Sequence, residues 1–178
     1  MCCERIRDVE PVARQRQIVK ARKNRAPGRV VRIDLGDGRR AYGRQLPGAS
    51  VEFYDHLGKA GERVGLLDVV AWPVAFTVAV MDYAFRRNGG WELLDVVLRT
   101  NEERAVIQRM AKKDVISGAL SIYWEDPETG TYGETPASIE DCEGLETAAV
   151  WDPEHVEDRL RDHFDGRPNR WVESLRLK

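Results

Sequence analysis

Apolar and polar residues alternate along the first third of the chain, and this pattern predicts an antiparallel sheet. From Val31 to Leu35 every second residue is apolar, which places one face of an extended strand against a core. The Gly36–Gly38 stretch supplies the positive φ angles that a tight hairpin needs. Two further strands complete a three-stranded meander with one buried face; they cover residues 41–46 and 51–54, with a Pro-Gly turn at 47–48.

Beyond the meander the pattern predicts several short elements. Residues 74–80, "VAFTVAV", are apolar on both faces and favour a central strand. Residues 101–113 have a charged first turn and predict a short helix capped by Thr100 or Asn101. The remaining expectations are a short strand or turn at 66–71, a turn at 88–90, strands at 91–98 and 121–124, an acidic turn at 138–143, and a strand or extended core segment at 145–151.

The clearest helix is expected at 153–165. Asp152 stands at its N-cap, Pro153 occupies the first helical position, and Gly166 ends it. Its buried stripe is expected to consist of Val156, Leu160 and Phe164.

These elements together predict an α+β fold. The sheet is expected to be a curled antiparallel meander, partly barrel-like, with a few helices that include the C-terminal amphipathic one. Residues 1–26 read as a basic, flexible N-terminal extension, and 27–178 as one domain. The core is expected to be led by Val31, Ile33, Phe53, Phe76, Val78, Trp91, Val156, Leu160 and Phe164.

The net charge of -2 hides a strong asymmetry between the two ends of the chain. Residues 1–50 hold 13 Lys/Arg against 5 Asp/Glu, a local charge of +8. Residues 125–166 hold 2 Lys/Arg against 14 Asp/Glu, a local charge of -12. Such a division indicates a partner of definite charge, an attraction between tail and body, or two solvated faces.

No residue pattern indicates catalysis, a cofactor or a metal. His155 and His163 lie eight positions apart on the expected helix, too far apart to share a metal ion. Cys142 stands between two acidic residues, which raise a thiol pKa and disfavour a nucleophile. The three cysteines show no disulfide spacing and favour a reducing cytoplasm. The longest apolar stretch, Val69 to Met81, is too short to cross a bilayer.

Three blocks of the sequence, in this order, resemble the bacterial immunity protein 26 family. The first is "PGRVVRIDLGDGRRAYGRQL…VEFYD", the second is "VAFTVAV" followed by "GGWELL", and the third is "CEGLETAAVWDPEHVEDRL" at 142–160. The resemblance implies an α+β immunity protein without catalysis, which binds and neutralises a cognate toxin domain encoded beside it. Residues 1–26 fall outside the resemblance.

The acidic C-terminal third, taken with this resemblance, suggests where a toxin would bind. A toxin that handles nucleic acid has a basic cleft, and an acidic surface would be steered into it. The candidate contacts are Glu154, Glu157, Asp158 and Asp162, which lie off the apolar stripe of the helix. The alternative to contact is an ordinary solvated helix face.

Two other classes of function stay open at this point. One is a small nucleic-acid-binding β-domain that uses the basic tail, although the acidic body would repel phosphate. The other is a hydrolase with a carboxylate pair among the acidic residues of 125–166.

Overall fold

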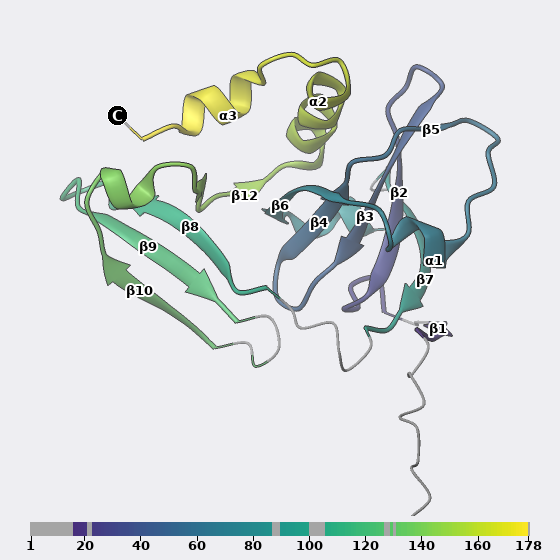
Figure 1. Cartoon of the computed structure of the whole chain (residues 1–178), viewed down its shortest axis with the longest axis horizontal. Coiled ribbons are helices and arrows are strands. Elements are labelled where there is room, and N and C mark those ends of the chain that lie inside the picture. Colours follow the sequence, from purple (N-terminus) through teal and green to yellow (C-terminus); the bar gives the residue numbers. More distant parts are fainter. Residues whose placement is uncertain are drawn as a thin grey trace, which may run out of the picture.

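The computed structural model describes residues 16–20, 23–86, 90–99, 106–126, 129 and 131–177. They form two β-sheets joined by short helices and loops (Figure 1). The predicted α+β class is confirmed. The single curled sheet is not confirmed, because the strands divide between two sheets. In the described residues neither sheet closes into a barrel.

The larger sheet has the strand order β1-β7-β2-β3-β4-β6-β12, with β5 paired to β3 outside this path. The predicted meander forms its centre as β2, β3 and β4. All pairings are antiparallel except that of β12 with β6. The bounds are β1 Ile18–Val19, β2 Arg29–Asp34, β3 Arg39–Gln45, β4 Ser50–Tyr54, β5 Gly58–Lys59, β6 Val74–Val80, β7 Glu92–Val97 and β12 Val150–Trp151.

Apolar residues are buried on both faces of the larger sheet. One face carries the main core, which includes all nine residues expected to lead it, with Phe164 partly buried at its edge. The other face carries a smaller cluster around Tyr42 and Tyr54, covered by the segment that contains Val69. Because both faces are covered, the central strands β3 and β4 are almost wholly buried.

Four helical segments flank the larger sheet. The expected C-terminal helix is confirmed as α2, and it packs Val156 and Leu160 into the main core. Residues 66–69, expected to be a short strand or turn, are a helical turn instead, with Asp68 near its start. The bounds are α1 Leu66–Val69, the 3-10 helix η1 Asp82–Phe85, α2 Pro153–Phe164 and α3 Arg170–Leu175. None of the helices in the described chain is long and apolar enough to span a bilayer.

The smaller sheet contains the main error of the sequence-based prediction. Residues 108–113, expected to end a helix, form strand β8, and the cap expected at 100–101 lies outside the described residues. Strand β8 is hydrogen-bonded to β9 on one side and β11 on the other, so sheet pairing overrides its helical propensity. The order is β10-β9-β8-β11, with bounds β8 Gln108–Lys113, β9 Leu120–Glu125, β10 Tyr132–Pro136 and β11 Glu146–Thr147.

Helix α3 connects the two sheets. In Figure 1 it leads from α2, above the larger sheet, toward the smaller sheet. Trp171, Val172 and Leu175 pack against the main core. The Leu175 carbonyl accepts a hydrogen bond from the hydroxyl of Thr147 in β11 at 2.8 Å. The position of the smaller sheet is therefore fixed partly by the C-terminal helix.

The division at residue 26 stays a prediction, to be tested by limited proteolysis. In the described part of the extension, Ile18–Val19 pair with Val96–Val97 as an edge strand. Arg25 donates to the Gly48 carbonyl and pairs with Asp82 at 2.8 Å. Residues near the proposed boundary therefore contact the larger sheet. The turn expected at 88–90 lies mostly outside the described residues, although Gly90 has the positive φ expected there, 86°.

Candidate partner-binding site

Helix α2 is positioned by its ends and by its buried stripe. Asp152 occupies the N-cap with extended dihedral angles, and Pro153 follows at the first helical position. The Asp152 carboxylate makes no capping hydrogen bond; it accepts one from the Tyr83 hydroxyl at 3.0 Å instead. Val156 and Leu160 are completely buried. The orientation of the helix is thus fixed, and so is the direction of its polar face.

Three of the four candidate carboxylates on α2 bind indole, guanidinium or amide groups of the chain itself, and the fourth, Glu154, binds a hydroxyl. Glu157 accepts a hydrogen bond from the Trp91 indole at 3.0 Å. Asp158 pairs with Arg161 at 3.0 Å and accepts from the Trp171 indole at 3.1 Å. These contacts hold the helix against Trp91, the residue before β7, and against α3. They are structural roles that the sequence did not reveal.

The other two candidates differ from each other. Asp162 accepts a hydrogen bond from the side chain of Asn169 at 2.9 Å and pairs with Arg167 at 3.1 Å. Glu154 is exposed, and its recorded partner is the hydroxyl of Tyr83 at 2.9 Å. Burial, together with the hydrogen bonds to Glu154 and Asp152, raises the pKa of Tyr83. Glu154 is therefore the one α2 candidate that is both exposed and outside the ion pairs recorded in the described chain.

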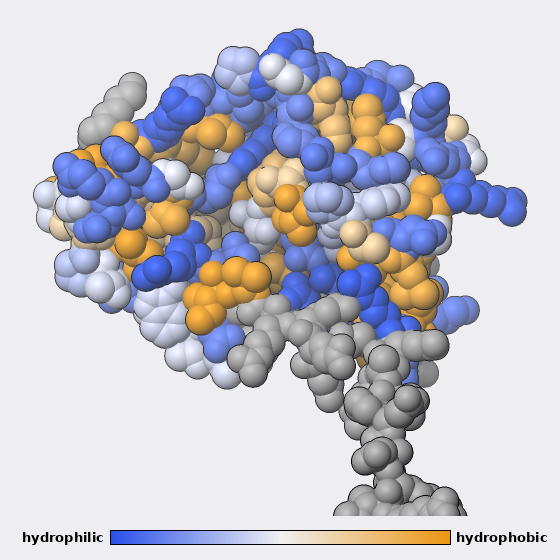
Figure 2. All heavy atoms as spheres, in the orientation of Figure 1, coloured by the Kyte–Doolittle hydropathy of each residue, from blue (hydrophilic) through white to orange (hydrophobic). Residues whose placement is uncertain are grey.

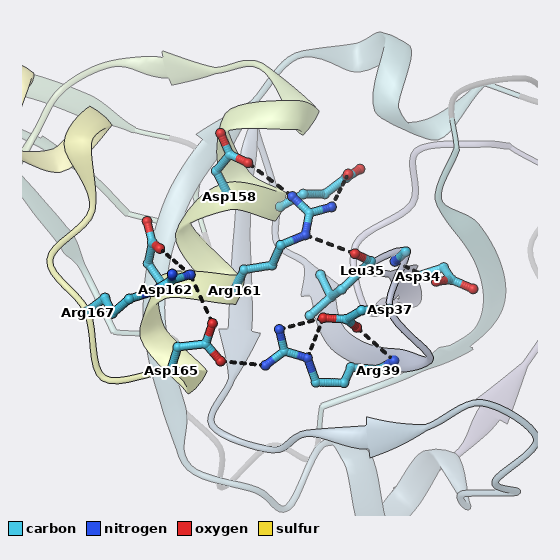
Figure 3. Close-up of polar contacts among 11 residues, drawn as sticks. Asp34, Leu35, Asp37, Arg39, Asp158, Arg161, Asp162, Asp165 and Arg167 are labelled. Atoms are coloured by element: carbon cyan, nitrogen blue, oxygen red, sulfur yellow. Dashed lines mark hydrogen bonds and ion pairs between the residues drawn. The ribbon is translucent and has the colours of Figure 1, made fainter.

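The Gly36–Gly38 hairpin is fastened to α2 by two arginines (Figure 3). Arg161 donates from Nε to the Leu35 carbonyl at 2.9 Å. Arg39 bridges two elements: it binds Asp37 in its own hairpin at 2.6 Å and Asp165 at the end of α2 at 2.7 Å. The hydrogen bond from Arg39 lowers the pKa of Asp37, and the hydrogen bonds from Arg39 to Asp37 and Asp165 raise the pKa of Arg39. The "LGDG" motif therefore serves to dock the helix.

A buried ionic cluster lies on the other face of the larger sheet. Glu52 accepts from Arg44 at 2.6 Å and from the Tyr54 hydroxyl at 2.9 Å, and Arg99 approaches its second oxygen at 3.3 Å. Glu52 and Arg44 are both buried. Burial, followed by the nearby Glu52 charge, raises the pKa of Tyr54. The Arg39–Tyr54 part of the meander is thus mostly interior.

The turn between β8 and β9 presents two apolar side chains to solvent. Val115 is 99% exposed and Ile116 is 98% exposed. The turn is well ordered by hydrogen bonds: the Asp114 carboxylate accepts from the backbone N–H groups of Ile116 at 3.1 Å and Ser117 at 2.7 Å. These bonds, with the Ser117 hydroxyl, lower the pKa of Asp114. Gly118 closes the turn with a φ angle of 74°.

An acidic turn lies at the same end of the smaller sheet. It is the 3-10 helix η2, Glu140–Cys142, which confirms the acidic turn expected at 138–143. Strand β10 runs back beside β9, and the Ala137 N–H donates to the Leu120 carbonyl at 3.0 Å, directly after the β8–β9 turn. Figure 1 shows η2 next to that turn. Ile139 is 41% exposed, and the acidic side chains around it are exposed as well: Glu140, Asp141 and Glu143.

Hydrogen bonds within this turn lower the pKa of two of its carboxylates. Asp141 accepts from the backbone N–H and the hydroxyl of Ser138, both at 2.9 Å, and these bonds lower its pKa. The pKa of Glu140 is lowered by its own backbone N–H and by Ser138. Within the described chain, no lysine or arginine forms an ion pair with either of these carboxylates or with Glu143.

A cavity of about 460 Å³ opens behind η2, between the smaller sheet and α3. Its lining includes Ile139, Glu143, Cys142, Trp151 and Leu175. Trp151 is 4% exposed, and its indole N–H has no hydrogen-bond partner in the described part of the chain. The free thiol of Cys142 is buried. On the face seen in Figure 2, apolar residues lie among charged ones over this end of the molecule.

The histidines occupy separate positions. His56 stacks on Trp72 with 3.6 Å between ring centroids, and His155 stacks on Trp171 at 3.5 Å. His163 contacts Asp55 at 2.8 Å. In the described ranges no three His, Cys, Asp or Glu side chains gather in a way that could hold a metal ion.

The end of the smaller sheet was missed by sequence reasoning. Strand β10 was not expected, and residues 114–119 had no assignment because 101–113 was read as a helix. A signal was present: "DVISGAL" combines a turn-forming Asp, Ser and Gly with two β-branched apolar residues. Recognising a hairpin there would have placed Val115 and Ile116 at its tip.

Comparison with known proteins identifies a family. The model of the family described as Immunity protein 26 matches residues 26–120, more than half of the chain. The match covers the meander, β6, β7, β8 and the β8–β9 turn, but it ends before residues 142–160, the third block of the resemblance. No curated protein and no solved structure matches the chain.

Proposed function

The chain belongs to the immunity protein 26 family, and from this premise we propose that it binds a cognate bacterial toxin domain and neutralises it by occlusion. The family implies an immunity protein of a polymorphic toxin system, and such proteins are generally not catalysts. The observation that carries the proposal is the family match over residues 26–120, which takes in the central strands of the larger sheet. We place this action in the cytoplasm of the cell that makes the toxin.

The use of charged groups in the structure supports occlusion over hydrolysis. A hydrolase with a carboxylate pair needs two carboxylates free to face a substrate. On α2, Glu157, Asp158 and Asp162 accept hydrogen bonds from indole, guanidinium and amide groups of the chain itself. These carboxylates serve to join elements, as expected of a rigid scaffold.

The basic N-terminal region gives little support to nucleic-acid binding. Arg25 pairs with Asp82 and lies 4.8 Å from the centre of the Phe85 ring. Arg29 is buried and donates to the Leu94 and Lys23 carbonyls. Arg25 and Arg29 are therefore engaged within the protein and are not available to phosphates.

The acidic residues of α2 stay a proposed contact for a basic, nuclease-type toxin. Glu154 is the best supported of the four, because it is exposed and its partner is a neutral hydroxyl. Replacing Glu157, Asp158 or Asp162 would break contacts that hold α2. Loss of binding in those variants would therefore not separate a lost interface from a loosened helix.

The test of the proposed function is a stoichiometric titration. The toxin domain encoded beside this chain is purified, and its activity is measured against rising amounts of the protein. Occlusion predicts that activity falls in proportion to added protein and ends near one equivalent, and that the two elute as a complex. Inactivation of a large excess of toxin over time would instead indicate catalysis, and absence of any complex or protection would overturn the proposal.

A further inference from the structure

The end of the smaller sheet has the properties of a protein-binding surface. Resting on the proposed function, we propose that the toxin docks there, on a set of residues that we call the tip surface. The tip surface consists of Val115, Ile116, Ile139, Glu140 and Glu143.

Val115 and Ile116 are unusually exposed for apolar side chains. Single apolar residues on a surface are common and need no explanation. Here two adjacent β-branched residues are 99% and 98% exposed on a turn that usually favours Gly, Asn, Asp or Ser. The Asp114 and Ser117 hydrogen bonds fix the turn, so the two side chains are presented in a preorganised way. Preorganisation reduces the entropy cost of binding.

The surroundings of the two apolar side chains also suit a partner. The Ala137–Leu120 hydrogen bond brings the start of η2 to the base of the β8–β9 turn. Ile139 and Glu143 belong to the tip surface and also line the 460 Å³ cavity. A protruding apolar turn beside a cavity offers two complementary shapes to a partner.

The charge of the surface defines the chemistry of the partner. Glu140 and Glu143 are exposed and have no cationic partner among the described residues, while Lys112 on the approaching strand is already paired with Glu134. A partner that covers Val115 and Ile116 must therefore have an apolar socket with basic side chains at its rim. A second copy of this chain would bring the same carboxylates and so fits less well.

A toxin that acts on nucleic acid would provide such a socket. Grooves that hold single strands combine basic side chains for the phosphates with apolar or aromatic platforms for the bases. The tip surface would insert its apolar turn against the platform and place its carboxylates near the basic rim. Substrate would then be excluded without any chemical step.

The experiment compares matched variants for binding to a catalytically inactive form of the toxin domain encoded beside this chain. Val115→Ser with Ile116→Ser removes the apolar tip, and we expect Kd to rise about 100-fold if both side chains are buried on binding. The control is Leu67→Ser with Val74→Ser, which removes two similarly apolar side chains, 44% and 49% exposed, far from the tip. The control is expected to bind like the wild type.

A second pair of variants tests the charges. Glu140→Lys with Glu143→Lys should reduce the association rate about tenfold at low salt and less at high salt. Asp141 is left in place because it accepts the Ser138 N–H. Glu154→Lys reports on the proposed α2 contact in the same assay, and a larger fall in association rate than in the Glu140→Lys, Glu143→Lys pair would overturn the tip surface as the main contact.

Each outcome decides the proposal. Wild-type binding with an unchanged Kd in the Ser pair would overturn the tip surface while leaving toxin neutralisation intact. Failure of the wild type to bind would overturn both. Sedimentation of the free protein should show a monomer; a dimer that dissociates in the Ser pair would assign the tip to self-association and overturn toxin docking.

Discussion

Helix α2 and the tip surface are both acidic, but their carboxylates bind different kinds of group. On α2, Glu157 and Asp158 bind arginine and tryptophan side chains from α2 itself, from α3 and from the residue before β7. At the tip, Glu140 and Asp141 bind neutral groups of their own turn. Local charge therefore does not by itself identify an interface. The distinguishing feature is whether the charge has a partner within the fold.

The apolar residues of α2 and of the tip surface also differ in whether they are covered within the fold. Leu160 on α2 is completely buried, whereas Ile116 at the tip is 98% exposed. The first contributes to folding, and the second leaves apolar area available for a partner. Substitutions that are matched in chemistry should thus act on stability in one region and on binding in the other.

The largest effect is expected for Leu160→Ala. Removing a completely buried leucine costs the transfer free energy and leaves a cavity, so the free energy of unfolding should fall by about 2–5 kcal/mol. Ile116→Ala should change it by less than about 0.5 kcal/mol. Denaturant unfolding of both variants measures the difference. Equal losses would mean that the tip is packed and would remove the contrast between the two regions.

A smaller effect is expected at the two glycines that end these elements. Gly166 after α2 and Gly118 in the β8–β9 turn have φ angles of 66° and 74°, and a Cβ at either position meets no atom within 4 Å. Substitution by Ala at each should therefore cost only the left-handed backbone strain, about 1–2 kcal/mol. We expect similar losses of stability by chemical denaturation, but a loss of toxin affinity only for Gly118→Ala. A loss of affinity in Gly166→Ala alone would favour α2 as the interface.

Removal of one charged side chain from each region should also affect stability differently. Arg161→Met removes the donor to the Leu35 carbonyl, and Leu35 is buried, so the loss should be about 1 kcal/mol. Lys112→Met removes the exposed pair with Glu134, and such pairs contribute about 0–1 kcal/mol. Thermal unfolding under the same conditions compares the two variants. An equal or larger loss for Lys112→Met would show that the smaller sheet depends on its charges as much as α2 does.

The sequence predicted the larger sheet and α2 because their signals are local. The alternation from Val31 to Leu35, the glycine turn and the Asp152–Gly166 boundaries each lie within a few residues. The smaller sheet depends on β8 pairing with β9 and β11, and the latter lies more than thirty residues away. A segment such as "QRMAKK" has good helix formers and takes its conformation from those neighbours.

The contacts that the candidate site residues make within the fold were not predicted, for a related reason. Glu157, Asp158 and Asp162 were correctly placed off the apolar stripe, but a helical wheel does not show that Trp91, Trp171 and Asn169 approach them. Exposure at the tip required knowledge of β10 and η2, which bring residues 137–143 beside the β8–β9 turn. Both corrections come from long-range contacts.

The smallest expected effect is a change in the pKa of two exposed carboxylates, Asp37 and Asp114, whose pKa values are both lowered in the fold. The pKa of Asp37 is lowered first by its hydrogen bond to the Arg39 guanidinium. The pKa of Asp114 is lowered by the Ser117 backbone N–H and hydroxyl and by the Ile116 N–H, which are neutral donors. In both cases the folded pKa lies below the unfolded value of about 3.9, so each contributes stability above that pH and loses it as pH falls through the folded pKa.

Because 1 M salt shortens the Debye length to about 3 Å, it should raise the pKa of Asp37 toward its ordinary value and move the pKa of Asp114 less. Carboxyl-carbon NMR titrations at about 0.05 and 1 M NaCl measure both groups in one sample, with Arg39→Met as the control that should raise Asp37 alone. Equal salt shifts would show that the tip turn is held by charge as α2 is, and the distinction between the two regions would then rest only on their apolar residues.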